Sequence, residues 1–524
     1  MVPVLGGIGV TWIVSNFAPE AKGHGVPEVM DAIYYKGGVI RPVVALVKSI
    51  ASALAIGSGS AVGREGPIIQ IGSALGSTLG QIIHMQAGQR ITLVGAGAGA
   101  GIAATFNTPI GGVLFATELM LPEISVNTFL PVARATGTAT FIGRLFFGTQ
   151  PAFDVPFNLA AIPNEPSSVL TPILYAMLGG IVGLAAAGFV RGLHYLESGF
   201  DEISGRYLRH AIGMLIVGIM MYVLWVAAGH YYIEGVGYST IQAILHNQLP
   251  AAPFLLVLFV CKLLATSVSL GSGSSGGVFS PSLYMGATLG AAFASIVTML
   301  FPGAPVSLPA FAMVGMGAMV GGGTGAAMTA VTMIFEMTRD YNIVLPMILA
   351  VAVALAVRRM VSHENIYTLK LVRRGHPIPK ALHANMFLVH SAADIMERDF
   401  LVLDGGTSFA EYTKLAAAQG GSRHVVITQN GMIVSGLLVD ADLLQMFNAA
   451  TTDVRLDALI QKNFTIVGEC DVAFDVINTM SRMRAMIAIV VSRVTGQNSQ
   501  RVVGVITKEH VADAVAKSVK IYPG

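Results

Sequence analysis

The sequence predicts a polytopic α-helical membrane protein with inverted repeats and broken or re-entrant helices, followed by a cytoplasmic α+β tandem domain. First, 54% of the 524 residues are hydrophobic and only 11% are charged, whereas soluble globular proteins carry about 25% charged residues. Second, residues 1–360 hold 29 of the 60 charged side chains and the last 164 residues hold 31. A lipid-embedded part therefore precedes a water-exposed part.

Apolar runs in the first part are short and are interrupted by glycine, proline and serine. A simple spanning helix needs about 20 apolar residues in a row, and few runs reach that length. The runs are Pro42–Gly57, Ile68–Ile83, Ile110–Leu121, Ile173–Phe189, Leu255–Leu270, Leu308–Val320 and Ile343–Val357. Interrupted helices are tolerated at membrane depth only where they are buried in protein or line a polar cavity. We therefore expect an interior site.

The two halves of this part carry similar glycine-rich and serine-rich loops. GSGSAVGREGP spans Gly57–Pro67, and GSGSSGGVFSP spans Gly271–Pro281. Paired interruptions of this kind in two halves of a membrane protein mark a midplane binding site between inverted repeats.

After residue 370 the pattern changes to alternating strands and helices. The expected elements are strands at Arg423–Ile427 and Ile433–Leu438 with a helix at Asp440–Phe447, then strands at Ile487–Val491 and Val502–Ile506 with a helix at Lys508–Ala516. GLLVDADLL at 436 and GVITKEHVA at 504 correspond, 68 residues apart. The tail is thus a predicted tandem repeat of small α+β units.

The basic cluster Arg358, Arg359, Arg373 and Arg374 beside the last apolar run places this end of the chain in the cytoplasm by the positive-inside rule. We expect a membrane domain at 1–370, a linker at 371–385 and a tandem domain at 386–524, divided into about 386–450 and 451–524.

A charged pair, Arg64 and Glu65, lies inside the apolar stretch AIGSGSAVGREGPIIQIGSALG. Ionisable side chains in membrane segments are usually functional. The alternative is a salt bridge at the membrane edge, but adjacent residues on a helix do not face each other. The pair therefore indicates a functional site in this stretch.

Four segments together resemble one known family. They are GHGVPEVMDAI at Gly23–Ile33, GREGP at Gly63–Pro67, GGVFSP at Gly276–Pro281, and Tyr367 after the last apolar run. With GAGIAATFNTPIGGVLFATELM at Gly99–Met120 and EMTRDYNIVLPM at Glu336–Met347, the chain resembles the CLC family of chloride channels and proton-coupled chloride transporters over nearly all of residues 1–370. The tail resembles a pair of CBS domains.

The resemblance implies a role for each motif residue. The Glu65 carboxylate would mimic chloride, occupy the anion path when ionised and swing out when protonated. Backbone N–H groups of Val278 and Phe279 and the hydroxyl of Tyr367 would line the central anion site. The resemblance also implies that His24, Gly25, Arg64 and Gly66 are anion-binding residues. Tyr367 has an alternative role as an interfacial anchor.

Two lysines, Lys48 and Lys262, also lie in apolar runs. They either add to the positive field that attracts anions or merely snorkel to the membrane surface, and we favour the second interpretation.

The chain departs from the family at His24, where members commonly have serine in the first motif. An imidazole is larger than a hydroxyl and changes charge near pH 6.5. If His24 points at the ion path, chloride affinity should rise on acidification; if it turns away, backbone N–H groups must serve. Sequence leaves both orientations open.

A second departure concerns proton coupling. Proton-coupled members carry two consecutive acidic residues where this chain has Glu118 and Leu119, and the second acid receives protons from the cytoplasm. Because leucine carries no proton, the sequence favours a chloride channel gated by a protonatable glutamate. The alternative is a chloride/proton antiporter in which Glu118 or water substitutes as the proton pathway.

The tail keeps half of a nucleotide-binding motif in each copy. CBS pairs often bind adenine nucleotides through G-x-x-[ST]-x-x-D. The first copy keeps Asp442 but has Val439 for the hydroxyl, and the second keeps Thr507 but has His510 for the aspartate. A dimerising module without ligand is therefore favoured over an adenine-nucleotide site.

Family likeness further predicts a homodimer, formed through the membrane domain and the CBS domains, in a prokaryotic plasma (inner) membrane, with chloride as the transported ion. No metal, required cofactor, nucleic acid or enzymatic activity is expected. A nucleotide-responsive enzyme using GAGAGAG at Gly95–Gly101 as a phosphate loop is disfavoured, because the run lacks the GK[ST] ending. N-terminal helices common in the family are expected to be missing, since about twenty residues precede Gly23.

Overall fold

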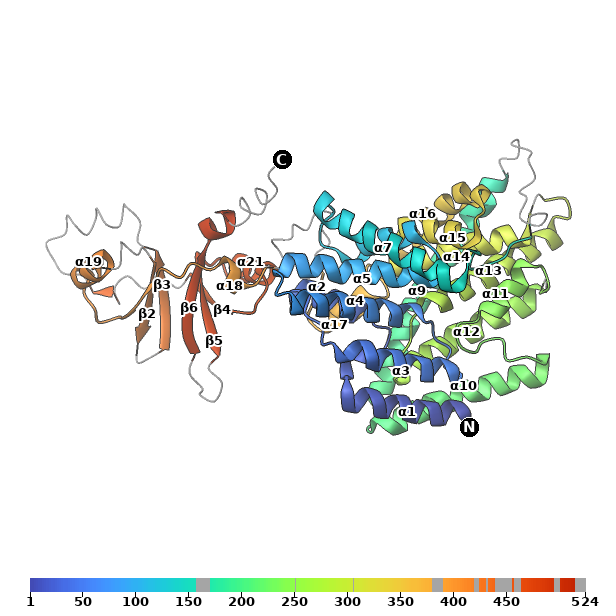
Figure 1. Cartoon of the computed structure of the whole chain (residues 1–524), viewed down its shortest axis with the longest axis horizontal. Helices are drawn as coiled ribbons and strands as arrows, with labels where there is room; N and C mark the ends of the chain where they lie inside the picture. The colour runs from blue at the N-terminus through green and yellow to red at the C-terminus, as the bar shows by residue number, and fades with distance from the viewer. Residues whose placement is uncertain are drawn as a thin grey trace. The chain divides into compact units, whose positions relative to one another are not determined.

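The computed structural model describes residues 1–156, 170–249, 251–304, 306–378, 390–418, 424–429, 432–438, 455–456, 463–493 and 500–513. The chain forms two compact units, Met1–Pro379 and Lys380–Gly524, shown as ribbons in Figure 1. The first unit is helical, and the second combines small sheets with helices.

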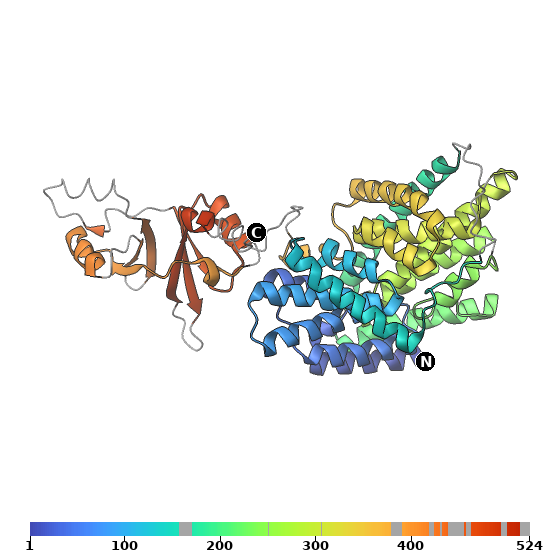
Figure 2. The same ribbon diagram turned by 45° about the horizontal axis from the view of Figure 1, so that its top comes forward.

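The first unit consists of two successive sets of helices. The first set is α1 (Val2–Phe17), η1 (Pro19–Ala21), α2 (Val26–Tyr35), α3 (Val43–Gly57), α4 (Glu65–Ile82), α5 (Ala87–Phe106), α6 (Pro109–Phe115), η2 (Ala116–Met120) and α7 (Val126–Phe147). The second set is α9 (Leu170–Asp201), α10 (Arg206–Ala228), α11 (Tyr238–Leu245), α12 (Ala252–Ser272), α13 (Phe279–Leu300), α14 (Leu308–Thr324), α15 (Ala327–Thr338), η3 (Tyr341–Ile343), α16 (Val344–Val361) and α17 (Thr368–Arg373). Figure 2 shows the first set in blue to cyan and the second in green to orange.

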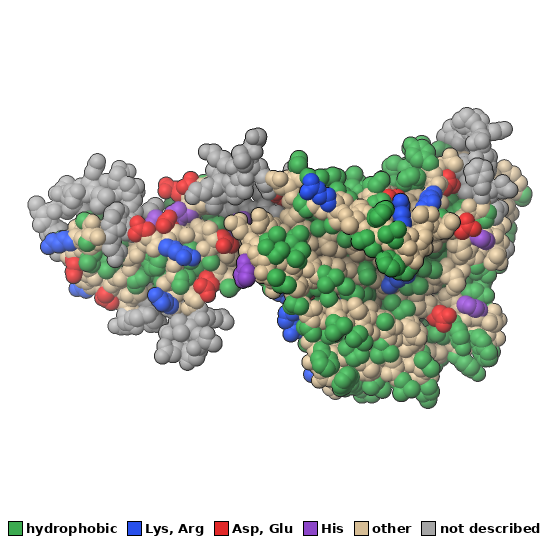
Figure 3. Space-filling model, in the orientation of Figure 1, with side chains coloured by type: hydrophobic (Ala, Val, Ile, Leu, Met, Phe, Trp, Pro, Cys, Tyr) green, Lys and Arg blue, Asp and Glu red, His purple; other side chains and the backbone are tan. Residues whose placement is uncertain are grey.

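Five described helices are long and apolar enough to cross a membrane. They are Leu170–Asp201, Arg206–Ala228, Ala252–Ser272, Phe279–Leu300 and the continuous segment Tyr341–Val361. Five further apolar helices in the described residues have only 10–17 residues, which fits the short runs of the sequence. Hydrophobic side chains cover much of the visible face of this unit (Figure 3), as expected for a surface in contact with lipid.

Glycine contacts repeat at equivalent places in the two sets. A Cβ on Gly72 of α4 would lie 2.2 Å from the Gly97 carbonyl oxygen of α5, and a Cβ on Gly286 of α13 would lie 2.3 Å from that of Gly315 in α14. Gly72 and Gly286 each lie seven residues after the first residue of their helix. The α4–α5 and α13–α14 pairs thus approach through the same device, as small residues permit in membrane helices. Because Gly97 belongs to GAGAGAG, this run is a helix-packing surface and not a phosphate loop.

Lys48 and Lys262 also form an equivalent pair, and both are fully buried. The Lys48 Nζ donates hydrogen bonds to the carbonyl oxygens of Ala21 (2.9 Å) and Gly23 (2.7 Å), just before α2. Lys262 Nζ donates to those of Ile233 (2.9 Å) and Gly235 (2.7 Å), just before α11. The snorkelling interpretation is therefore wrong, because both ammonium groups satisfy buried backbone carbonyls inside the unit.

The second unit contains two β-α-β-β motifs. Its elements are α18 (Ala392–Ile395), β1 (Leu401–Asp404), α19 (Phe409–Ala418), β2 (His424–Gln429), β3 (Met432–Leu438), β4 (Phe464–Gly468), α21 (Ala473–Arg482), β5 (Ile487–Arg493) and β6 (Gln500–Thr507). The sheet orders are β1-β2-β3 and β4-β5-β6. In each sheet the first pair of strands is parallel and the second antiparallel.

These motifs match the predicted tandem repeat. The four predicted strands correspond to β2, β3, β5 and β6. β3 begins one residue earlier than predicted, β5 ends two residues later, and β6 is longer by two residues at its start and one at its end. β2 begins at His424, one residue later than predicted, and ends at Gln429, two residues later. Val426 of the first sheet packs in one apolar cluster with Ile487, Ile489 and Val505 of the second. Residues 508–513 are helical, as expected, and the predicted helix Asp440–Phe447 lies outside the described residues.

The buried lysines generate a stability prediction. Lys48→Met should lower the unfolding temperature of the detergent-purified protein, because it leaves the carbonyls of Ala21 and Gly23 without a charged donor. The loss should be on the order of 3–6 kcal/mol, since two hydrogen bonds are removed and each hydrogen bond to a charged group contributes roughly 1.5–3 kcal/mol. Lys414→Met, at an exposed position of α19, is the control. Equal unfolding temperatures for the two variants would contradict this role.

Candidate functional site

The three glycine-rich motifs are joined by backbone hydrogen bonds. The Gly63 N–H donates to the Gly277 carbonyl (2.8 Å), and the Gly277 N–H donates to the Gly63 carbonyl (2.6 Å). Gly23 donates to the Ser274 carbonyl (3.2 Å), and Gly276 donates to the Gly23 carbonyl (3.3 Å). The beginnings of α2, α4 and α13 therefore meet, although they come from both sets of helices.

Two glycines make this close approach possible. A Cβ on Gly66 would lie 2.1 Å from the His24 carbonyl oxygen, and a Cβ on Gly277 would lie 2.6 Å from the Gly66 nitrogen. The first N–H groups of each helix have no intrahelical acceptor. Three sets of such donors are thus brought to one place, where they favour an anion.

Glu65 is the first residue of α4 and is fully buried. Its carboxylate accepts hydrogen bonds from the Ser280 backbone N–H (3.2 Å), the Ser280 hydroxyl and the Tyr238 hydroxyl (2.6 Å). Ser280 is the second residue of α13. The carboxylate therefore lies at the N-terminus of α13, the kind of position that suits an anion.

Arg64 does not pair with Glu65. Its guanidinium lies 5.3 Å from the ring centroid of Tyr238 and 5.9 Å from that of Phe106, which is cation–π distance. The arginine is exposed while the glutamate is buried. The salt-bridge alternative is thus wrong.

His24 and Tyr367 lie next to each other inside the unit. Their ring centroids are 5.8 Å apart, and their exposed fractions are 3% and 1%. The His24 Nδ1 is buried without a hydrogen-bond partner among the described residues. The His24 ring therefore lies beside that of Tyr367, and the burial of Tyr367 argues against an interfacial anchor.

Val278 and Phe279 are the N-cap and first residue of α13, and Gly25 is the N-cap of α2. Both Val278 and Phe279 are buried. Their N–H groups belong to the unsatisfied donors of a helix start. The predicted donors for an anion are therefore all at the beginnings of helices that meet.

Glu118 and Glu336 cap each other's helices. The Glu118 carboxylate, in η2, accepts from the N–H groups of Met328 (3.2 Å) and Thr329 (2.8 Å) at the start of α15. Glu336, near the end of α15, accepts from those of Ile110 (3.1 Å) and Gly111 (2.7 Å) at the start of α6. Each set of helices thus supplies the acid that caps a helix of the other set. Leu119, next to Glu118, is buried.

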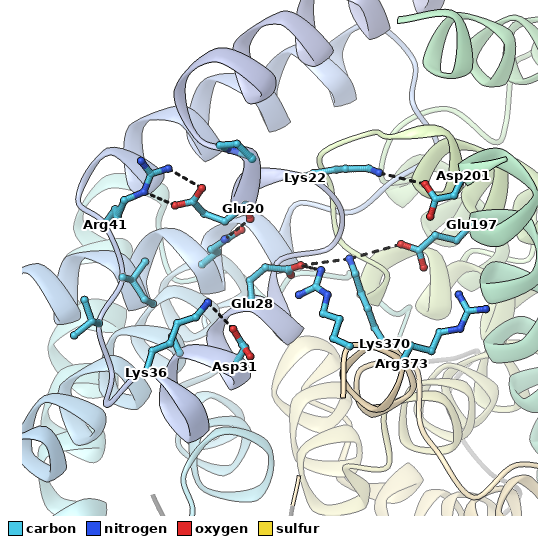
Figure 4. A pocket seen from close by; sticks show the side chains of 16 residues that line it. Glu20, Lys22, Glu28, Asp31, Lys36, Arg41, Glu197, Asp201, Lys370 and Arg373 are labelled. Atoms are coloured by element: carbon cyan, nitrogen blue, oxygen red, sulfur yellow. Dashed lines mark hydrogen bonds and ion pairs between the residues drawn. The ribbon is translucent and has the colours of Figure 1, made fainter. Parts of the chain in front are cut away.

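A cavity of about 840 Å³, here called the charged vestibule, lies beside the His24–Tyr367 end of the site. Its charged lining residues are Glu20, Lys22, Glu28, Asp31, Lys36, Arg41, Glu197, Asp201, Lys370, Arg373 and Arg374. Figure 4 shows Lys370 between Glu28 and Glu197, with N–O distances of 3.3 and 3.7 Å. Glu28 of α2 lies four residues after His24, and Lys370 of α17 lies three residues after Tyr367, so the vestibule adjoins the site.

A second cavity, of about 530 Å³ and here called the arginine cavity, lies at the Glu65 end. Its lining includes Arg64, Arg144, Phe106, Asn107 and Tyr238. Among the described residues, no Asp or Glu side chain lines this cavity. An anion would meet positive charge there without a competing carboxylate.

Sequence reasoning missed several of these residues. Tyr238 lies 173 positions from Glu65, and no motif connected them. Lys370 had a weak signal, since it lies one helical turn after Tyr367.

In the second unit, the Thr507 hydroxyl accepts from the His510 N–H (3.3 Å), while Asp442 lies outside the described residues.

Comparisons with known proteins show which family the chain is similar to. A family profile described as voltage gated chloride channel matches residues 6–359. A Ralstonia nicotianae protein named putative chloride channel protein ClcB-like is 32% identical over 402 residues, covering 71% of this chain and 85% of that protein. A Salmonella arizonae protein named H(+)/Cl(−) exchange transporter ClcA is 32% identical over 375 residues, covering 69% and 76%. The crystal structure of a slow cyanobacterial Cl⁻/H⁺ antiporter matches with a TM-score of 0.62 and 25% identity, covering 71% and 86%.

The tight glycine contact generates a second prediction. Gly66→Ala should abolish chloride binding, because the new Cβ would overlap the His24 carbonyl oxygen and push the starts of α2 and α4 apart. Gly180→Ala, in α9 where an added Cβ meets nothing within 4 Å, is the matched control. Isothermal titration of both proteins with chloride in detergent measures the effect; retained binding in the Gly66 variant would refute the assembly.

Proposed function

The chain belongs to the voltage-gated chloride channel (CLC) family, and from this membership and the site geometry we propose that it exchanges chloride for protons across a membrane. It is a multi-pass membrane protein. The observation that carries the proposal is the Glu65 carboxylate, which is buried at the N-terminus of α13. A carboxylate that occupies an anion position when ionised and carries a proton when neutral can couple chloride movement to proton movement.

The proposed cycle follows from the chemistry of that carboxylate. When ionised, Glu65 occupies the donors at the start of α13 and blocks the path. Protonation removes its negative charge, which weakens the hydrogen bonds from those donors and lets chloride replace it. Release of the proton on the other side returns the carboxylate to α13.

The other motif residues are assigned to chloride. We propose that the N–H groups of Val278 and Phe279 and the Tyr367 hydroxyl coordinate the ion, with His24 beside them as a further ring donor. Gly25 and Gly66 are proposed to let backbone approach the ion. Arg64 is proposed to attract anions from the arginine cavity, since it lines that cavity.

A chloride channel gated by Glu65 is the second candidate. Leu119 favours it, because position 119 supplies no carboxylate, and one relative is named a putative chloride channel. Exchange ranks first because the Salmonella relative and the cyanobacterial structure are named as proton exchangers. An exchanger of this sequence would have to bring protons to Glu65 through water or another side chain.

The proton-pathway role predicted for Glu118 stays a prediction. Its carboxylate accepts three hydrogen bonds at the start of α15, and so supplies acceptors for donors that a helix start leaves unpaired. We therefore favour a structural role for Glu118, as the helix cap that mirrors Glu336.

We further propose a homodimer in a prokaryotic inner membrane with the C-terminal unit in the cytoplasm. The basic residues Arg358, Arg359, Arg373 and Arg374 at the end of the membrane unit support this orientation. For the second unit, the two β-α-β-β motifs support the assignment as a CBS pair.

The exchange proposal makes the third prediction. In proteoliposomes, a chloride gradient should drive protons uphill, and Glu65→Gln should remove proton transport and the pH dependence of chloride flux, because an amide cannot ionise. Glu202→Gln, at an exposed position, is the control. Measurements of internal pH and chloride efflux distinguish exchange from channel activity. Chloride flux without proton movement would contradict exchange and support the chloride channel.

The CBS pair is proposed to act without a bound nucleotide, which gives the fourth prediction. Saturating AMP, ADP or ATP should leave the unfolding temperature of the full chain unchanged, because each copy keeps only half the motif and Thr507 already pairs with His510. Binding at a hundredfold excess over Kd would stabilise the protein by about 2.7 kcal/mol. An upward shift that Thr507→Val removes would contradict the proposal and locate a nucleotide site.

A further inference from the structure

Tyr238 is fixed at the first position of α11 by a tight turn. Gly237, the N-cap of that helix, has a φ of 79°, which favours glycine. A Cβ on Gly237 would also lie 2.6 Å from a ring carbon of Tyr284. Only glycine therefore fits at the N-cap of the helix that carries Tyr238.

The ring of Tyr238 is held by aromatic and cationic neighbours. Phe153 meets it edge-on with centroids 5.4 Å apart, and Phe106 lies at 6.4 Å. The Arg64 guanidinium lies 5.3 Å from the ring centroid. The direction of the hydroxyl is thus set by packing against residues of three different segments.

The hydroxyl of Tyr238 points at the Glu65 carboxylate. It donates a hydrogen bond of 2.6 Å to Glu65 Oε1, and its oxygen lies 3.0 Å from the Ser280 hydroxyl. The same Oε1 accepts from that serine. Tyr238 contributes a side-chain donor to the gate in addition to the backbone donor of α13.

We propose that Tyr238 is a positioning residue that holds the ionised Glu65 on α13 and thereby sets the pH at which the gate opens. The inference rests on the proposed role of Glu65 as the gate. A hydrogen bond to the ionised form of an acid favours that form. Each opening must break the Tyr238 bond, so the hydroxyl shifts opening to lower pH.

Other charged and titratable groups also act on Glu65. Arg64 precedes it, and Lys262 of α12 and Tyr367 at the start of α17 interact with it electrostatically. Lys262 in turn interacts with Glu234. Tyr238→Phe changes none of these groups and keeps the packed ring, so a change in the pH profile reports the hydroxyl.

The test is the pH dependence of chloride flux in proteoliposomes. Tyr238→Phe should raise the pH of half-maximal flux by on the order of one unit, because the ionised carboxylate loses one charge-assisted hydrogen bond. Tyr175→Phe, a buried tyrosine that stacks on Phe311, is the control and should keep the wild-type profile.

Glu65→Gln and the double variant Glu65→Gln/Tyr238→Phe separate the positioning role of Tyr238, here called the latch, from the role of Glu65 as the gate. Flat and equal profiles for these two, with a shifted profile for Tyr238→Phe alone, would support the inference. An unshifted Tyr238→Phe beside a flat Glu65→Gln would overturn the latch and leave the gate intact. A Glu65→Gln protein that kept its pH dependence would overturn the gate and the latch with it.

Discussion

The hydrogen bonds between the Glu65 carboxylate and the start of α13 are the interaction on which the rest of the membrane unit depends. A carboxylate is costly to bury unless donors replace its water. Here the donors are the Ser280 N–H and hydroxyl and the Tyr238 hydroxyl, which belong to the second repeat, whereas Glu65 belongs to the first. The acid is therefore stable only where the two repeats meet.

Several features of the fold keep these helix starts together. Backbone pairs join Gly63 to Gly277 and Gly23 to the 274–276 loop. Lys48 and Lys262 satisfy carbonyls that precede α2 and α11. The lysine contacts occur once in each set of helices, so helix starts are exposed inside the unit without leaving these buried carbonyls unsatisfied.

The two cavities give the site two different sides. The charged vestibule joins the His24–Tyr367 end and contains both cations and carboxylates, whereas the arginine cavity joins the Tyr238–Glu65 end. Ions that approach the site from these two sides would thus meet different electrostatic surroundings. In this arrangement Tyr238 lies between the arginine cavity and Glu65, because its ring is within cation–π distance of Arg64 and its hydroxyl donates to Glu65.

The sequence by itself determined the two-part organisation, the similar glycine-rich loops of the two halves and the positions of the helix starts that follow them, because composition and glycine spacing are local properties of the chain. It also identified Glu65, since an acid inside an apolar run needs a reason to be there. Only the tertiary structure decided where His24 points, what Lys48 and Lys262 do, that Glu118 caps α15, and that Tyr238 contacts Glu65. These outcomes depend on contacts between residues from about 25 to more than 200 positions apart, and no local pattern encodes which distant donor or acceptor a buried polar group will meet.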